Sequence, residues 1–333
     1  MAIKKIGVLT SGGDAPGMNA AIRAVVRTAL YNDIDVVGIK RGYEGLLNAF
    51  RYNGSIDSEN IINMTPRSVS DIIQRGGTIL LTARSEEMRT PEGQDKAAKN
   101  CRDLELDALV VIGGDGSLHG GAELIRRGVN VIGLPGTIDL DLVCSEYTIG
   151  FDTAVNTAME AIGKIRDTSG SHERCSIVEV MGRNAGYIAL WCGLTGGAEE
   201  ALIPEDSATN NHEELEELIQ RNRKKGKTHN LIVVAEGIGN SVKMAKEIEG
   251  RIGIETRATI LGYLQRGGSP TAVDRLHASV MGYMAVDVLL QGKQNRVIVV
   301  KNGKDVDIDL EEGLNEQRVY DPTMYNILKT LSV

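Results

Sequence analysis

Residues 5–17 read KIGVLTSGGDAPG, and residues 108–117 read ALVVIGGDGS. In both stretches a short apolar run ends in two glycines and an aspartate. A third apolar run ends in PGTID at residues 135–139. Strands that are apolar on both faces are typical of a buried parallel sheet, and the turns that follow such strands lie at its carboxyl edge. The sequence therefore predicts an α/β fold in which these three turns lie together.

Similar runs of strand length recur along the chain, with amphipathic stretches between them, as expected for parallel sheets covered by helices. Apolar spacing predicts helices over residues 22–30 and 151–165, and caps and charges predict another over Glu213–Lys224, closed by Gly226. The polar stretch Arg51–Ser68 is interpreted as an excursion, and a domain break is placed near Gly150. The predicted strands are Ile6–Thr10, Val36–Ile39, Ala108–Ile112, Val131–Leu134, Ser176–Met181, Leu231–Ala235 and Val297–Val300.

The 333 residues carry 37 Lys and Arg against 45 Asp and Glu, a formal net charge of −8, which argues against a nucleic-acid binder. No long apolar run suggests a membrane span or a secretory signal, so we expect a soluble, cytoplasmic protein. The cysteines lack CxxC spacing and are expected to be reduced thiols in or near the core, namely Cys101, Cys144, Cys175 and Cys192.

Glycine lets the backbone approach an anion closely, and a helix N-terminus supplies free N–H groups to a phosphate. The sequence does not match either of two common phosphate-binding motifs, because a required glycine is missing at the spacing of each. The P-loop pattern before Gly226-Lys227-Thr228 has Arg221 where glycine is required, and the dinucleotide pattern has His119 at its third glycine. The alternative interpretation is three tight strand-to-helix turns without a ligand.

Acidic residues accompany these turns. A carboxylate beside bound phosphate is unfavourable without a cation between them, so Asp115 is a candidate Mg²⁺ ligand. Asp139 and Asp141 would point the same way in extended chain, and one of them could accept a proton from an attacking hydroxyl. Capping or turn carboxylates are the alternative. Arginine forks suited to phosphate oxygens also lie in predicted loops, at Arg84, Arg89, Arg174, Arg183, Arg257 and Arg266.

With these residues in view, the chain resembles the bacterial ATP-dependent 6-phosphofructokinase family (phosphofructokinase family A) over nearly its whole length. The resemblance is carried by SGGDAPGMNAAIR from Ser11, GGDGS from Gly113, PGTIDLD from Pro135, YTIGFDTA from Tyr147, SHER and VEVMGR from Ser171 and Val178, and ETRATILGYLQRGGSPTAVDR from Glu255.

The resemblance implies two Rossmann-like three-layer αβα domains with mostly parallel sheets and the active site in the cleft between them. Residues 1–150 plus about 265–315 would form the larger, ATP-binding domain. Residues 151–264 plus the C-terminal segment would form the smaller, sugar-phosphate-binding domain.

The implied reaction is phosphoryl transfer from MgATP to the 1-hydroxyl of fructose 6-phosphate, a step of glycolysis. Asp139 would be the general base, with Thr137 and Arg183 holding the reacting groups. Asp115 and Asp141 would contact Mg²⁺. The nucleotide would be bound by Gly13, Tyr43, Arg84, Gly114, Asp115, Gly116 and Ser117.

The resemblance assigns the sugar phosphate to Thr137, Asp139, Met181, Gly182, Arg183, Glu236, Tyr263 and Arg266, with Arg174 and Arg257 reaching in from a neighbouring subunit. An active site completed in this way implies an oligomer, and the family is typically a homotetramer. An effector site for ADP or phosphoenolpyruvate would use Arg23, Arg27, Arg166, Glu199, Lys225 and Lys227.

ATP is the expected phosphoryl donor, because pyrophosphate-dependent relatives tend to carry Asp and Lys where this chain has Gly116 and Gly136. Glycine leaves room for the inner phosphates of ATP. Two residues depart from the family pattern. Leu140 replaces the Asn of PGTIDND, and Tyr263 replaces the His of LGHIQRGG.

These departures keep other functions open. The chain could be a weakly active or non-catalytic paralogue that binds nucleotide and regulates a partner, or a kinase of another sugar phosphate such as sedoheptulose 7-phosphate. An NAD or lipid kinase using the GGDG turn is a further alternative. It would leave the downstream arginines without a shared ligand.

Overall fold

Within residues 3–332, which the computed structural model of the chain describes, the strands form two sheets, one in each of two units. Unit 1 comprises Met1–Ile138, Leu142–Asp152 and Gly267–Arg318. Unit 2 comprises Asp139–Asp141, Thr153–Arg266 and Val319–Val333. The chain thus enters unit 2 briefly at residues 139–141 before it returns to unit 1.

The sheet of unit 1 has the strand order β11-β10-β5-β4-β1-β2-β3. Its five inner strands run parallel, and the edge strands β3 and β11 pair antiparallel with their neighbours. The strands are β1 (Lys5–Ser11), β2 (Asp35–Ile39), β3 (Ile61–Asn63), β4 (Ala108–Gly113), β5 (Val131–Pro135), β10 (Arg296–Lys301) and β11 (Lys304–Asp309).

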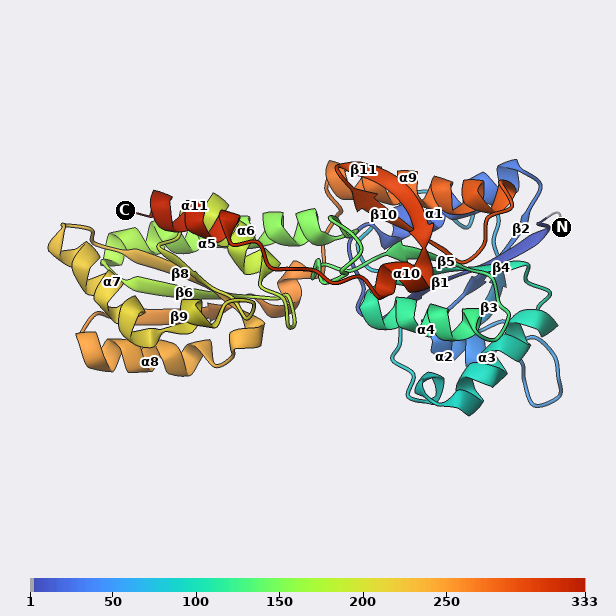
Figure 1. Ribbon diagram of the computed structural model, residues 1–333, viewed down its shortest axis with the longest axis horizontal. Helices are drawn as coiled ribbons and strands as arrows, with labels where there is room; N and C mark the ends of the chain where they lie inside the picture. The colour runs from blue at the N-terminus through green and yellow to red at the C-terminus, as the bar shows by residue number, and fades with distance from the viewer. Residues whose placement is uncertain (1–2, 333) are drawn as a thin grey trace. The chain divides into compact units, whose positions relative to one another are not determined.

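Helices cover both faces of this sheet (Figure 1), which gives three layers. Helices α1 (Met18–Tyr31) and α9 (Ala272–Leu290) lie on one face. Helices α2 (Gly42–Leu47), α3 (Pro91–Asp103) and α4 (Asp115–Ile125) lie on the other, where Leu46, Cys101 and Leu118 belong to one buried cluster with Leu9 and Val111. The short helices η1 (Glu87–Arg89) and α10 (Leu310–Leu314) complete the unit.

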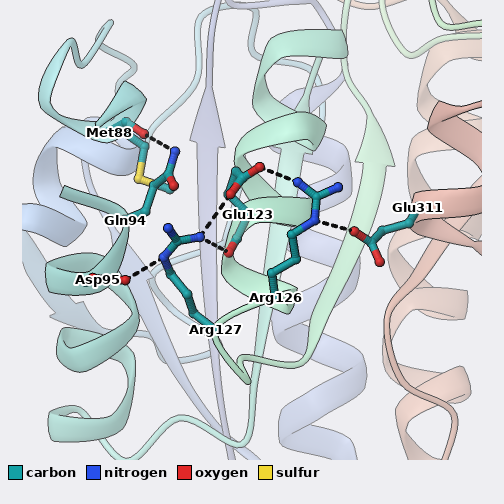
Figure 2. A network of polar contacts seen from close by, with 7 residues as sticks. All are labelled: Met88, Gln94, Asp95, Glu123, Arg126, Arg127 and Glu311. Atoms are coloured by element: carbon teal, nitrogen blue, oxygen red, sulfur yellow. Dashed lines mark hydrogen bonds and ion pairs between the residues drawn. The ribbon is translucent and has the colours of Figure 1, made fainter. Parts of the chain in front are cut away.

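A polar network ties the end of α4 to its neighbours (Figure 2). Arg127 Nε contacts Asp95 of α3 at 2.7 Å, and Arg126 Nε contacts Glu311 of α10 at 2.9 Å. Both arginines also pair with Glu123. Exposed ion pairs contribute little individually, but together these contacts fix the C-terminal end of the helix whose N-terminal end carries the GGDGS turn.

Unit 2 has an all-parallel sheet in the order β7-β8-β6-β9. Its strands are β6 (Cys175–Val180), β7 (Glu200–Leu202), β8 (Asn230–Ala235) and β9 (Thr256–Ile260). Helices α5 (Phe151–His172), α6 (Tyr187–Thr195) and α11 (Thr323–Leu331) lie on one face, and α7 (His212–Lys224) and α8 (Ser241–Ile252) on the other (Figure 1). The short helices are η2 (Ser207–Asn210), η3 (Glu236–Ile238) and η4 (Gly262–Gln265).

The predicted α/β class with mostly parallel sheets is confirmed, and each predicted strand is present. The interpretation of Arg51–Ser68 as a mere excursion is wrong in part, because β3 lies inside it and pairs with β2. Three residues are too few for an apolar period to be visible in the sequence. The structure also adds β7, β9 and β11, which are short or only partly buried edge strands.

Two smaller expectations are also met. Asn211 caps α7, since its Oδ1 accepts the N–H of Glu213 at 3.1 Å. All four cysteines are free and buried, and burial raises the pKa of the Cys175 and Cys192 thiols to about 12. No helix within residues 3–332 combines the length and hydropathy that crossing a bilayer requires.

Candidate functional site

The three glycine-rich turns of unit 1 meet at one edge of its sheet. In the register of the parallel strands, Ser11 lies beside Gly113 and Gly113 lies beside Pro135. The carboxyl ends of β1, β4 and β5 are therefore adjacent, as the sequence predicted. We call residues 11–14, 113–117 and 135–137 the glycine-rich edge.

Glycine is required where these ends approach one another. A Cβ on Gly113 would lie 2.6 Å from the carbonyl oxygen of Ser11 and 2.6 Å from Cβ of Ser117. A Cβ on Gly114 would lie 3.3 Å from Cβ of Thr137. The 2.6 Å distances would force the ends of β1 and β4 apart, so Gly113 allows them to lie this close, whereas at Gly114 Thr137 would have to yield slightly.

Helix α4 begins at Asp115, directly after the second of these glycines, and Gly114 gives it no side-chain cap. The positive end of the helix dipole therefore lies at the glycine-rich edge, where an anion would be stabilised. A Cβ on Gly116 would meet no atom within 4 Å, so the first turn of α4 is open on this side. Of the other two turns, the first ends at Gly17, which is the N-cap of α1, whereas the third is not followed directly by a helix, since α5 starts at Phe151.

Asp115 presents a carboxylate at this edge. Its side chain is 45% exposed, and its Oδ1 lies 3.2 Å from Nδ1 of His119 one turn along α4. Carboxylate oxygen is a donor that Mg²⁺ prefers, and Mg²⁺ commonly takes one or two carboxylates together with substrate phosphates. The donor chemistry at Asp115 therefore fits a magnesium-bound nucleotide.

The remaining nucleotide candidates of unit 1 differ in exposure. Arg84 is exposed in the loop after Thr82, whereas Tyr43 is only 5% exposed and donates from its hydroxyl to the carbonyl of Ser117 at 2.6 Å. Arg23 and Arg27 lie on α1 of the same unit.

Sequence reasoning gave no role to two residues that shape this edge. Asn19 is completely buried, donates to the carbonyls of Arg75, Gly76 and Gly77, and accepts the N–H of Ile79 at 2.8 Å. Thr82 donates to the carbonyl of Gly12 at 2.6 Å. The polar Asn19 among the apolar residues that start α1 was the available signal, because a buried amide needs partners.

In unit 2, the segment of Asp139 and Asp141 is not extended. Leu140 between them has φ of 55° and is 4% exposed, so the backbone turns left-handed at this residue. The expectation that the two carboxylates point the same way because they lie in extended chain is therefore wrong. Asp139 is 6% exposed, and Arg266 Nη2 lies 4.0 Å from its Oδ1.

A loop after β6 brings further candidates together. The N–H groups of Gly182 and Arg183 both donate to Oε1 of Glu236, the former at 3.2 Å. Gly182 has φ of 143°, and a Cβ there would lie 2.4 Å from the carbonyl of Ala185. The Glu236 carboxylate thus fixes this loop, and Arg183 itself is exposed.

Gln265 is another residue that the sequence did not single out. Its Oε1 accepts the N–H of Met181 at 2.8 Å, and its neighbour Arg266 faces Asp139. The side chain is completely buried. Met181, Glu236, Arg266 and Asp139 therefore belong to one connected group in unit 2.

Arg174 and Arg257 lie elsewhere in unit 2. Both pair with Glu255, at 2.7 and 2.6 Å, and the hydrogen bond from Arg174 lowers the pKa of that carboxyl below its usual range. Arg174 precedes β6, whereas Met181 follows it. At about 3.3 Å per residue, β6 places Arg174 roughly 20 Å from the Met181 loop. Arg257 lies on β9 beside Ser176, near the same end of β6 as Arg174. Tyr263 is 83% exposed.

The effector candidates of unit 2 do not form one contact group. Arg166 donates to the carbonyl of Gly197, and Lys227 pairs with the buried Glu199 at 2.5 Å. Lys225 instead lines a cavity of about 260 Å³ together with Arg221 and Lys329. Arg23 and Arg27 belong to the other unit.

Parallel sheets covered by helices, with glycine-rich turns at the carboxyl edge and acids beside them, are typical of α/β enzymes that act on nucleotide phosphates. Comparison with known proteins narrows this class. Residues 5–289 match the family model described as phosphofructokinase, and the chain belongs to that family.

Among similar proteins is the ATP-dependent 6-phosphofructokinase of Clostridium botulinum strain Hall, 56% identical over 330 residues, which are 99% of this chain and 100% of that protein. The enzyme of the same name from Clostridium tetani is also 56% identical over 330 residues. The phosphofructokinase structure from Saccharomyces cerevisiae aligns with a TM-score of 0.82 and 35% identity, covering 99% of this chain and 48% of that one. This chain thus spans about half of the yeast chain.

Proposed function

We infer that the chain is an ATP-dependent 6-phosphofructokinase. It transfers the γ-phosphoryl group of ATP to the 1-hydroxyl of fructose 6-phosphate and gives fructose 1,6-bisphosphate and ADP. The full-length similarity to enzymes of that name supports this function. The structural observation that carries it is the adjacency of three strand ends at the glycine-rich edge.

On the nucleotide side, Gly13, Arg84 and residues 114–117 bind the ATP phosphates. Support comes from the start of α4 at Asp115 and from the open space at Gly116. Asp115 and Asp141 would hold Mg²⁺, which, when bound, neutralises charge on the phosphates during transfer. The half-exposed carboxylate of Asp115 at the glycine-rich edge supports the first of these assignments.

On the sugar side, Asp139 accepts the proton of the 1-hydroxyl as its oxygen attacks the γ-phosphorus and ADP leaves. Its low exposure and its neighbour Arg266 support this role, because a buried base is shielded from water and the guanidinium of Arg266 lies 4.0 Å from its Oδ1. Thr137 and Arg183 hold the reacting groups. Met181, Gly182, Glu236, Tyr263 and Arg266 bind the sugar phosphate.

Arg174 and Arg257 act on the sugar phosphate of a neighbouring subunit in a homotetramer. Their positions support this assignment, since Arg174 directly precedes β6 and Arg257 lies beside Ser176 near the start of that strand, whereas Met181 follows its other end. An effector such as ADP or phosphoenolpyruvate binds through Arg23, Arg27, Arg166, Glu199, Lys225 and Lys227. The position of Arg23 and Arg27 in the other unit is compatible with an effector site that is completed at a subunit interface.

A coupled assay of ADP release tests the function. We expect ADP release with ATP and fructose 6-phosphate, and much less with sedoheptulose 7-phosphate. With pyrophosphate as donor no ADP can form, so fructose 1,6-bisphosphate is assayed instead, and we expect much less of it than with ATP. Asp139→Asn should lower kcat by about 10²-fold or more while both substrates still bind, because the variant loses the base. Absence of turnover in the wild-type protein, or normal kcat in Asp139→Asn, contradicts the proposal.

A further inference from the structure

Tyr43 of α2 is buried against the helix that starts at the glycine-rich edge. Its hydroxyl donates to the carbonyl of Ser117 at 2.6 Å, and its side chain is 5% exposed. Ser117 is the third residue of α4 and follows Asp115 and Gly116. A side chain of another helix therefore reaches the backbone of the turn that binds phosphate.

The sequence of α4 makes room for this ring. A Cβ on Gly120 would lie 2.8 Å from Cε2 of Tyr43, and one on Gly121 would lie 3.7 Å from its hydroxyl oxygen. Gly120 stands inside the helix, where glycine costs about 1 kcal/mol relative to alanine. Close packing of Tyr43 on the helix backbone is what this glycine permits.

On its other side, Ser117 lies against the strand ends. A Cβ on Gly12 would lie 3.1 Å from the Ser117 hydroxyl oxygen, and one on Gly113 would lie 2.6 Å from it. Ser117 is 6% exposed. It is therefore enclosed between the ends of β1 and β4 and the Tyr43 phenol, so a shift of Tyr43 moves the first turn of α4.

We propose that Tyr43 is a positioning residue for the nucleotide phosphates. Its hydroxyl holds the first turn of α4 against the glycine-rich edge, and it acts through the Ser117 carbonyl instead of touching the base. This inference rests on the proposed nucleotide site. It assigns to Tyr43 a function in the geometry of the phosphate turn, with Gly120 as the residue that admits the ring.

Burial raises the pKa of Tyr43 well above its usual value near 10, so the hydroxyl is still a donor at about pH 9. Removing the hydroxyl should therefore have the same effect at about pH 6 and at about pH 9.

The decisive variant is Tyr43→Phe, which keeps the ring and removes the donor. Losing one hydrogen bond to the turn should raise KM for the nucleotide by about threefold to tenfold. The factor should be the same for ATP, GTP and ITP, and calorimetry should show the same weakening for inorganic tripolyphosphate. KM for fructose 6-phosphate should stay within about twofold. Tyr52→Phe is the matched control, because Tyr52 is fully exposed.

A second pair of variants tests the packing. Gly120→Ala places a methyl group against the Tyr43 ring and should raise KM for all three nucleotides together. Gly250→Ala is the control, since Gly250 also lies in a helix and its Cβ would meet no atom within 4 Å. This control should change neither KM value.

A change in preference among the bases would show that Tyr43 contacts the base and would overturn the inference. So would unchanged nucleotide KM values in Tyr43→Phe, or equal increases for nucleotide and fructose 6-phosphate. If wild-type protein releases ADP with fructose 6-phosphate while Tyr43→Phe behaves like it, only this inference fails. If the wild type shows no such turnover, the proposed function fails first.

Discussion

The amide oxygen of Gln265 accepts the backbone N–H of Met181 at 2.8 Å, deep within unit 2. This contact joins the loop after β6 to the residue next to Arg266, the arginine that faces Asp139. The candidate sugar-phosphate residues are thus held by a neutral side chain that takes no part in the proposed reaction.

Gln265→Leu should weaken both the fold and substrate binding. The buried N–H of Met181 loses its acceptor, which costs about 1–3 kcal/mol of unfolding free energy. KM for fructose 6-phosphate should rise while KM for ATP changes little. Urea unfolding and steady-state kinetics measure these effects. Gln220→Leu, at an exposed position of α7, is the control, and equal behaviour of the two variants would contradict the prediction.

At position 140, glycine should be more stabilising than alanine. A left-handed conformation costs a residue with a Cβ about 1–2 kcal/mol, and Leu140 has φ of 55°. Leu140→Ala loses the buried side chain and still pays the cost of the left-handed conformation. Leu140→Gly also loses the side chain, but glycine adopts this conformation without that cost. We expect the Gly variant to exceed the Ala variant by about 1 kcal/mol in unfolding free energy.

Ala278, in the interior of α9, is a reference position at which alanine should be more stable than glycine. There, Ala278→Gly should lower stability by about 1 kcal/mol, because glycine disfavours a helix interior. Chemical denaturation of the four proteins, including the wild type, measures both differences. The same order of Ala and Gly at both positions would be incompatible with a left-handed Leu140.

Two substitutions at Gly116 distinguish the effect of added volume from the effect of added charge at the glycine-rich edge. Gly116→Ala should fold at least as well as the wild type, since its Cβ meets no atom within 4 Å and alanine favours a helix. Gly116→Asp should fold too but raise KM for ATP by about tenfold or more, because its carboxylate repels the phosphates. Thermal unfolding and kinetics distinguish these cases. An equal KM for the Ala and Asp variants would exclude the charge effect.

His277 should make stability depend on pH. The hydrogen bond that His277 Nδ1 donates to Oδ1 of Asp305, at 3.0 Å, raises the pKa of His277 despite partial burial. The folded state therefore binds the proton more tightly than the unfolded chain does. The resulting stabilisation is fully present below the unfolded pKa of about 6.5, and it is lost as the pH rises through the folded value.

Asp305→Asn removes the carboxylate that faces His277 and leaves the His277 ring in place, with its centroid 4.4 Å from that of the Tyr147 ring. The variant should therefore be less stable than the wild type at about pH 6, and the difference should shrink toward about pH 9. Urea unfolding at both pH values measures it. A difference that is constant with pH would show that the His277 charge does not contribute.

Local patterns predicted most of the parallel strands because each is buried on both faces and appears as an uninterrupted apolar run. Edge strands were missed for the converse reason. The three residues of β3 pair on one side only, and residues of β11 alternate between charged and apolar. Gln265 shows the same limit for the site, since a buried amide looks like any surface amide until its partners are known.

The amino-acid sequence alone determined the α/β class, the glycine-rich turns and the acids beside them, because apolar runs and glycine positions are local properties of the chain. Only the tertiary structure decided the order and register of the strands at the glycine-rich edge, that Leu140 bends the chain between two carboxylates, and that Tyr43 supports Ser117 from another helix. Each of these depends on contacts between residues distant in sequence or on a backbone angle set by surrounding packing, and neither is encoded in a local pattern.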